Sequence, residues 1–167
     1  MGIFENTILV DKKVSIGNLI ARYLCIAVIL FCLIVSFTVL PGILILPAVL
    51  FGVLWYVLKT ASQLEYEYTY IEGRLTFARI KAKRKRKNLA KVEMEEVILI
   101  APSTAHELYN YHNSRDTEIR NYSSGKADVK TYEIIYKNGT GIGDIIFEPD
   151  EAMLEKMRVR YAKIVNM

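Results

Sequence analysis

The 167-residue chain is poor in the side chains that carry chemistry, with only two cysteines and two histidines. Cys25 and Cys32 lie on one face of an expected apolar helix, so they cannot form a disulfide with each other and are predicted to be small packing residues. His106 and His112 lie in a polar segment without a nearby cysteine. Because zinc needs three or four ligands at matching spacing, we expect exposed loop histidines and no metal site.

Motifs of the common enzyme classes are also missing. The sequence contains no G-x-S-x-G, no H-E-x-x-H and no nucleophile and base that can be placed together. The glycine-rich stretch at 139–143 lacks the Lys-Ser/Thr pair of a P-loop and precedes no helix, so it predicts a hairpin with a bulge. We therefore expect a protein that is not an enzyme and has no cofactor.

Charge is absent from Tyr23 to Leu58, a run of 36 residues without Asp, Glu, Lys, Arg or His. About 20 apolar residues cross a bilayer, so one straight helix would be too long. Pro41-Gly42 divides the run, which predicts a transmembrane helical hairpin over residues 19–61 with its turn at 41–42. A re-entrant hairpin that does not fully cross is the alternative.

Basic residues flank this hairpin, and its turn carries no charge. The positive-inside rule then predicts a two-span protein of the bacterial cell membrane with both termini in the cytoplasm. The flanking basic residues are Lys12, Lys13 and Arg22 before the hairpin and Lys59, Arg74 and Arg79 after it. Residues 1–18 are expected to form a cytoplasmic N-terminal segment, and residues 62–167 a cytoplasmic domain.

Strand patterns dominate that domain. In residues 65–70, polar residues alternate strictly with three tyrosines, which predicts a strand with the tyrosines on one face. Residues 74–80 are predicted to form the second strand of a hairpin with it. Further strands are predicted within 91–101, as one strand or two with a bend, and at 129–136 and 143–147, the last two joined at Asn138-Gly139. Residues 103–128 are polar, with one short strand or helical turn expected inside them.

A C-terminal amphipathic helix is predicted over residues 149–165, with an apolar stripe at helical spacing. The whole therefore predicts an α+β fold, in which a two-helix transmembrane hairpin precedes an antiparallel β-domain closed by one helix. A partly open barrel or sandwich of this plan is pleckstrin-homology-like (PH-like).

The strongest candidate for a binding site is a basic run at 74–91, which holds nine Lys or Arg residues and no acid. Each basic residue near an anionic leaflet contributes about 1 kcal/mol. We expect this run to bind anionic phospholipid headgroups, while a merely solvated charged hairpin is the alternative. The candidate lipid-binding residues are Arg79, Lys81, Lys83, Arg84, Lys85, Arg86 and Lys87. Nucleic acid is not expected, because the lipid headgroup is the nearer anion.

The chain resembles a family of small uncharacterised two-helix membrane proteins from Gram-positive anaerobic bacteria. The residues that carry this resemblance are the string from Leu64 to Tyr70, then Gly73, Ile80, the basic residues at 83–87 and Ala101-Pro102. Tyr122-Ser123-Ser124 and the F-x-P-x-E start of the last helix are further matches. The order of elements also resembles membrane-anchored bacterial PH-like proteins. The resemblance implies a fold and a location, and brings no catalytic or binding residue with it.

Two functional hypotheses remain open at this point. The first is a non-enzymatic membrane protein whose PH-like domain acts as an interaction or scaffolding module for an unknown protein partner. The second is a small accessory or regulatory subunit of a larger membrane complex, with the helical hairpin as its interface. The weak indication for the second is a set of small residues in the hairpin, namely Ala27, Ser36, Ala48 and Gly52.

Overall fold

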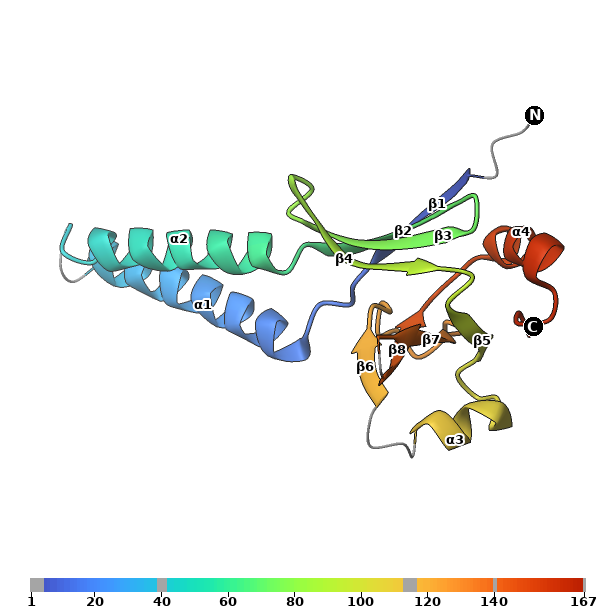
Figure 1. Ribbon diagram of the computed structural model, residues 1–167. Coiled ribbons are helices and arrows are strands. Elements are labelled where there is room, and N and C mark those ends of the chain that lie inside the picture. The colour runs from blue at the N-terminus through green and yellow to red at the C-terminus, as the bar shows by residue number, and fades with distance from the viewer. Residues whose placement is uncertain (1–4, 39–41, 113–116, 140, 167) are drawn as a thin grey trace. The chain divides into compact units, whose positions relative to one another are not determined.

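The computed structural model describes residues 5–38, 42–112, 117–139 and 141–166 (Figure 1). It divides into two compact units, each described here by itself. The helical unit comprises Lys13–Leu64 and Lys81–Arg84, and the β unit comprises Met1–Lys12, Glu65–Ile80 and Lys85–Met167. The helical unit contains α1 (Ile16–Thr38) and α2 (Ile45–Ala61).

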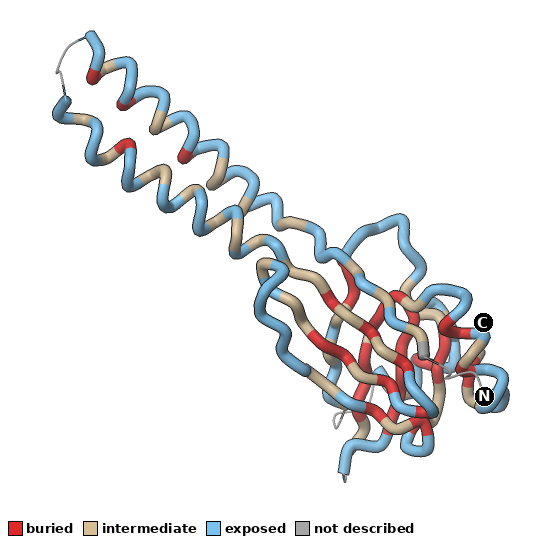
Figure 2. The backbone as a smooth tube through the Cα atoms, turned by 90° about the horizontal axis from the view of Figure 1, so that it is seen from above, coloured by how far each residue is buried: buried red, intermediate tan, exposed pale blue. Residues whose placement is uncertain are grey.

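The two helices of the helical unit lie side by side (Figure 1). Their buried residues are all small: Cys25, Cys32, Ser36 and Ala48. Figure 2 shows that the rest of both helices is exposed or half-buried. The prediction that the two cysteines are packing residues is confirmed, since both are free and buried.

Helix α1 is long and apolar enough to cross a membrane by length and composition. Only 17% of its apolar window is buried, which distinguishes it from the core helix of a soluble protein. Large apolar side chains cover its surface, including Phe31 and Phe37. Helix α2 is also apolar, but its 17 residues make it a shorter helix than a standard span. The predicted pair of spans is therefore supported for one helix only.

Residues 1–18 were expected to form a segment separate from the β-domain, but part of this segment belongs to that domain. Strand β1 (Glu5–Asp11) pairs antiparallel with β2 (Leu64–Ile71), from Glu5 opposite Ile71 to Asp11 opposite Glu65. The helical unit is thus an insertion between the first two strands of the domain. No local pattern indicated this, because β1 becomes recognisable as a strand only beside its partner, 54–66 residues further along the chain.

Sheet A has the order β1-β2-β3-β4, with β3 at Arg74–Lys81 and β4 at Lys85–Glu93. Strand β4 begins inside the basic run, six residues before the strand expected at 91–101. It ends at Glu93, a turn follows, and β5 occupies Val97–Pro102. The alternative of two strands with a bend is therefore the correct one.

Aromatic rings fill the space between sheet A and the second sheet. Tyr66, Tyr68 and Tyr70 are all buried, as their alternation predicted. The Tyr68 ring lies 5.5 Å from Phe77 of β3 and 5.7 Å from Phe147 of β8 (Gly141–Phe147), both in edge-to-face geometry. The tyrosine stripe is thus core.

Sheet B has the order β5-β7-β8-β6, with β7 at Tyr132–Asn138 and β6 at Thr117–Asn121. Strand β6 runs parallel to β8, which departs from the antiparallel expectation; the β5–β7 and β7–β8 pairings are antiparallel. Between β5 and β6 the chain forms η1 (His106–Leu108) and α3 (Tyr109–His112). Leu108 packs there with Ala101 and Ile135. One short strand or helical turn was expected within 103–128, and the structure has both.

The C-terminal helix α4 spans Glu151–Tyr161, shorter than the predicted 149–165. Asp150 caps it by accepting a hydrogen bond from the Met153 backbone N–H at 2.7 Å. Beyond the helix the chain adds to the free edge of β5, where the Ile100 N–H donates to the Ile164 carbonyl at 2.7 Å. The helix therefore ends early because the last residues extend sheet B.

The glycine-rich stretch forms part of the β7–β8 hairpin as predicted, but the expected bulge is absent from the described pairs, whose register is regular. A Cβ at Gly143 would overlap the ring of Tyr136 on the neighbouring strand.

Gly143→Ala is therefore expected to lower the free energy of unfolding by about 2–3 kcal/mol, because the ring is rigid and both strands are fixed. Thermal unfolding of the full chain in detergent would measure it. The control is Gly17→Ala, where the added methyl meets only Ser15 Oγ at 3.8 Å; an equal loss there would contradict the explanation.

Candidate functional site

The turn between β3 and β4 is a tight, strained and strongly basic loop. Ala82 and Lys83 both have φ of +54°, the pattern of a type I′ turn, and the Arg84 N–H donates to the Lys81 carbonyl at 3.2 Å. Residues other than glycine and asparagine seldom adopt this conformation, at a cost of about 1–2 kcal/mol each. Here it projects three basic residues from a single turn.

This turn is fixed to the end of α2 within the helical unit. The Ala82 backbone N–H donates to the Gln63 carbonyl at 2.8 Å. The two segments also share a pocket of about 260 Å³ that combines two cationic side chains, an aromatic ring and polar groups. The lining residues are Tyr56, Lys59, Thr60, Gln63, Ala82 and Arg84. Such a pocket offers hydrogen-bond donors and positive charge to an anion.

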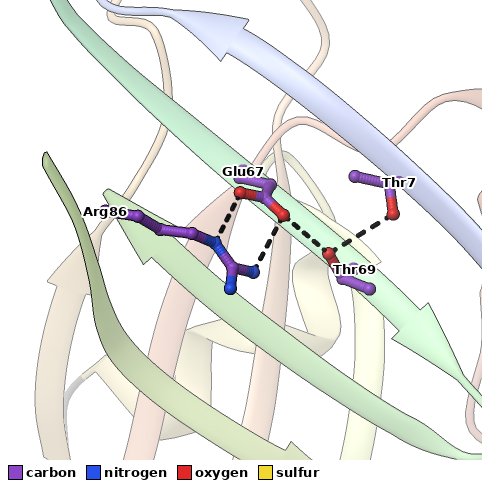
Figure 3. A network of polar contacts seen from close by, with 4 residues as sticks. All are labelled: Thr7, Glu67, Thr69 and Arg86. Atoms are coloured by element: carbon purple, nitrogen blue, oxygen red, sulfur yellow. Dashed lines mark hydrogen bonds and ion pairs between the residues drawn. The ribbon is translucent and has the colours of Figure 1, made fainter. Parts of the chain in front are cut away.

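Arg86 is held differently from its basic neighbours. Its guanidinium donates to both carboxylate oxygens of Glu67, from Nε at 2.8 Å and from a terminal nitrogen at 2.9 Å (Figure 3). Glu67 is largely buried and is also bonded to Thr69, which contacts Thr7 of β1. This network ties β4 to β2 and β1 across sheet A. The positive charge of Arg86 is therefore already compensated.

The seven predicted lipid-binding residues do not form one set. Lys81, Lys83 and Arg84 belong to the helical unit, beside Lys59. The remaining four belong to the β unit: Arg79, Lys85, Arg86 and Lys87. Arg79 is only half-exposed, and the other six are exposed. The structure thus concentrates the candidate surface at the turn, and adds Lys59, which the sequence analysis had treated only as a topology marker.

A second cluster lies in the β unit, where His112 of α3 meets Glu133 of β7 and Asp144 of β8. The His112 Nε2 lies 2.5 Å from Glu133 Oε2 and 3.5 Å from Asp144 Oδ2. Asp144 is fully buried, and the Glu133 side chain is 4% exposed. The two acids lie on one face of sheet B. Asp144 is directly opposite Ile135, and Ile135 is two residues after Glu133 on β7, so all three side chains are on the same side. His106 and His112 are both exposed, as expected, but His112 lies in the short helix α3 and contacts two buried acids, which the sequence did not indicate.

Electrostatics at this cluster are unusual. Burial, and after it the neighbouring Glu133 charge, raise the pKa of Asp144 to about 7, while His112 acts in the opposite direction. Neither oxygen of Asp144 has a hydrogen-bond partner among the described residues. Nothing local could have indicated two acids that lie 21 and 32 residues beyond His112.

Two of the residues that carry the family resemblance, Ser124 and Phe147, have structural roles. Ser124 donates from its backbone N–H and its hydroxyl to one buried oxygen of Glu148, at 2.9 and 2.8 Å. Phe147 lies in the aromatic core. These contacts fix the loop before β7 and the entry to α4, and they leave the basic turn and the His112 cluster as the candidate sites.

Of the comparisons with known proteins, the one with family models found a match. No curated protein and no solved structure matches the chain significantly. A family model described as a bacterial PH-like domain matches residues 5–167, which includes β1 and the inserted helices. The chain belongs to the bacterial PH-like domain family DUF6106.

Proposed function

We propose that the protein is a non-enzymatic integral membrane protein whose cytoplasmic PH-like domain is an interaction module, with the β3–β4 turn in contact with anionic lipid headgroups. The observation that carries this proposal is the hydrogen bond from Ala82 to Gln63. It holds the basic turn beside Lys59, the first charged residue after the apolar run. In a membrane-inserted hairpin, the turn would then lie near the level at which the apolar helix ends and headgroups begin.

The exposed apolar surface of both helices supports insertion as a hairpin. A soluble protein seldom leaves such a surface uncovered, and α1 is long enough to cross. Helix α2 extends for about 25 Å, so the bilayer would thin around it, or Ser62 and Gln63 would lie at the interface. Lys59 stacks over the Trp55 ring at 5.1 Å, an arrangement that suits an interfacial belt. With basic residues on both sides of the hairpin, both termini would face the cytoplasm.

A PH-like domain supports an interaction or scaffolding role. The protein partner would meet the exposed segment around α3 and β6, where Ile119 and Tyr109 are both more than half exposed. Strand β6 is an edge of sheet B and has pairing groups available on one side.

The accessory-subunit hypothesis remains the second candidate, with a specific observation in its favour. Of the four small residues expected at a helix interface, Ser36 and Ala48 are buried between α1 and α2. Gly52 instead has no neighbouring atom within 4 Å of where a Cβ would lie. Another membrane helix can approach closely at this position.

Reconstitution of the full chain tests the lipid part of the proposal. The full chain is required because a fragment starting at residue 62 lacks β1. We expect thermal unfolding in nanodiscs to occur at higher temperature when phosphatidylglycerol replaces part of the phosphatidylcholine, and high salt to remove the difference. An unfolding temperature that is independent of lipid charge at low salt would contradict headgroup binding and favour a protein partner.

A further inference from the structure

The cluster of exposed His112 with buried Glu133 and Asp144 has no role in the proposed lipid contact, and it belongs to a different unit from the basic turn. One nitrogen and two carboxylate oxygens converge there, with all three donor atoms within 4.8 Å of one another. Each comes from a different element, so the fold itself brings them together. We propose that these three side chains form a binding site for a divalent transition-metal ion of the zinc class.

The charge balance of the cluster favours a cation. Glu133 and Asp144 are both buried, and no Lys or Arg side chain forms an ion pair with either among the described residues. Burying an unpaired carboxylate costs several kcal/mol, and His112 can supply at most one positive charge. A divalent ion neutralises both carboxylates while the imidazole remains neutral, which is the form that binds metal.

Asp144 gives the independent indication of a ligand. Its side chain is fully buried and directed toward His112, yet neither carboxylate oxygen has a hydrogen-bond partner among the described residues. Buried polar groups in folded proteins are nearly always satisfied. Two unsatisfied oxygens on one carboxylate are therefore unusual, and metal coordination would satisfy at least one of them.

The geometry fits a small tetrahedral ion. Bonds of 2.0–2.2 Å place neighbouring donor atoms about 3.4 Å apart, and His112 Nε2 lies 3.5 Å from Asp144 Oδ2. The Glu133 oxygen, now hydrogen-bonded to His112, would move away by about 1 Å to coordinate the ion. The donor set of one imidazole and two carboxylates suits Zn²⁺ or Co²⁺. The His112 side chain is 37% exposed, which provides a route of entry from solvent.

The full chain in detergent, stripped with a chelator and then dialysed, is the sample for the test. Isothermal titration with Zn²⁺ should give one ion per chain, and Co²⁺ should produce the visible absorption of a tetrahedral site. His112→Gln and Asp144→Asn are each expected to abolish stoichiometric binding, because either change leaves two ligands. His106→Gln is the matched control. It removes the other histidine, which is exposed, and should bind as the wild type does.

Three results would overturn the proposal: no stoichiometric binding by the wild type, unchanged binding by both cluster variants, or equal loss in His106→Gln. In the first case the cluster is a proton-sharing histidine–acid network. Asp144→Asn keeps the shape of the side chain, so its unfolding without metal checks that lost binding is not lost folding. This test is independent of the lipid measurement, and either hypothesis can fail alone.

Discussion

Neutralising the β3–β4 turn by the triple change Lys81→Gln, Lys83→Gln and Arg84→Gln is expected to weaken the apparent affinity for phosphatidylglycerol about 100-fold at low salt. Each basic residue near an anionic surface contributes about 1 kcal/mol, and about 3 kcal/mol corresponds to a factor of roughly 100. The turn is held to the end of α2 by the Ala82–Gln63 hydrogen bond. Within the helical unit, these charges therefore lie beside the end of α2.

The measurement follows the unfolding temperature in nanodiscs as the fraction of phosphatidylglycerol rises. The control is a triple change of equal charge on α4, with Lys156, Arg158 and Arg160 each replaced by Gln. If both triples weaken binding equally, net charge alone is responsible and the turn has no special role. A second comparison is internal to the basic run. Arg86→Gln should have a smaller effect than Arg84→Gln, because Glu67 already compensates Arg86.

Asp144→Asn is expected to stabilise the metal-free protein at pH 8 by about 2 kcal/mol, although it removes an ion. The raised pKa of Asp144, about 7, means that the folded state holds this proton more tightly than the unfolded state, where the pKa is near 3.8. Stability from this group is fully present below about pH 4 and is lost progressively as the pH rises to about 7. A full shift of about three pKa units would correspond to about 4 kcal/mol, and relaxation of the site reduces that value.

The gain should therefore be small at pH 4 and largest above pH 7. Denaturant unfolding of chelator-treated protein at both pH values would measure it. Glu155→Gln is the control, since that carboxylate is exposed on α4 and its replacement should change stability little at either pH. A loss of stability at pH 8 in Asp144→Asn would show that the ionised carboxylate is favourable in the folded state. With Zn²⁺ present the sign should reverse, because the wild type alone gains the binding free energy.

Local patterns determined much of the fold. The alternation of Tyr66, Tyr68 and Tyr70 predicted one buried face, because side chains on a strand alternate with a period of two. Asn138-Gly139 predicted the β7–β8 hairpin, because its turn requires positive φ, and Gly139 has a φ of +61°. The uncharged run predicted the two apolar helices. In each case the information lies within a few neighbouring residues.

Only the tertiary structure decided the features that depend on distant pairing. Strand β1 exists because it has β2 as a partner, so residues 1–18 alone could not indicate the insertion of the helices into the domain. The parallel placement of β6 likewise depends on the path of the chain over one face of sheet B.

The sites divide in the same way. The basic residues at 83–87 were visible in the sequence because they are contiguous, but the compensation of Arg86 by Glu67 required the sheet. His112, Glu133 and Asp144 are separated by 21 and 11 residues and share no local period. Composition fixes which charges are present, whereas burial and strand register decide which of them meet, and with what pKa.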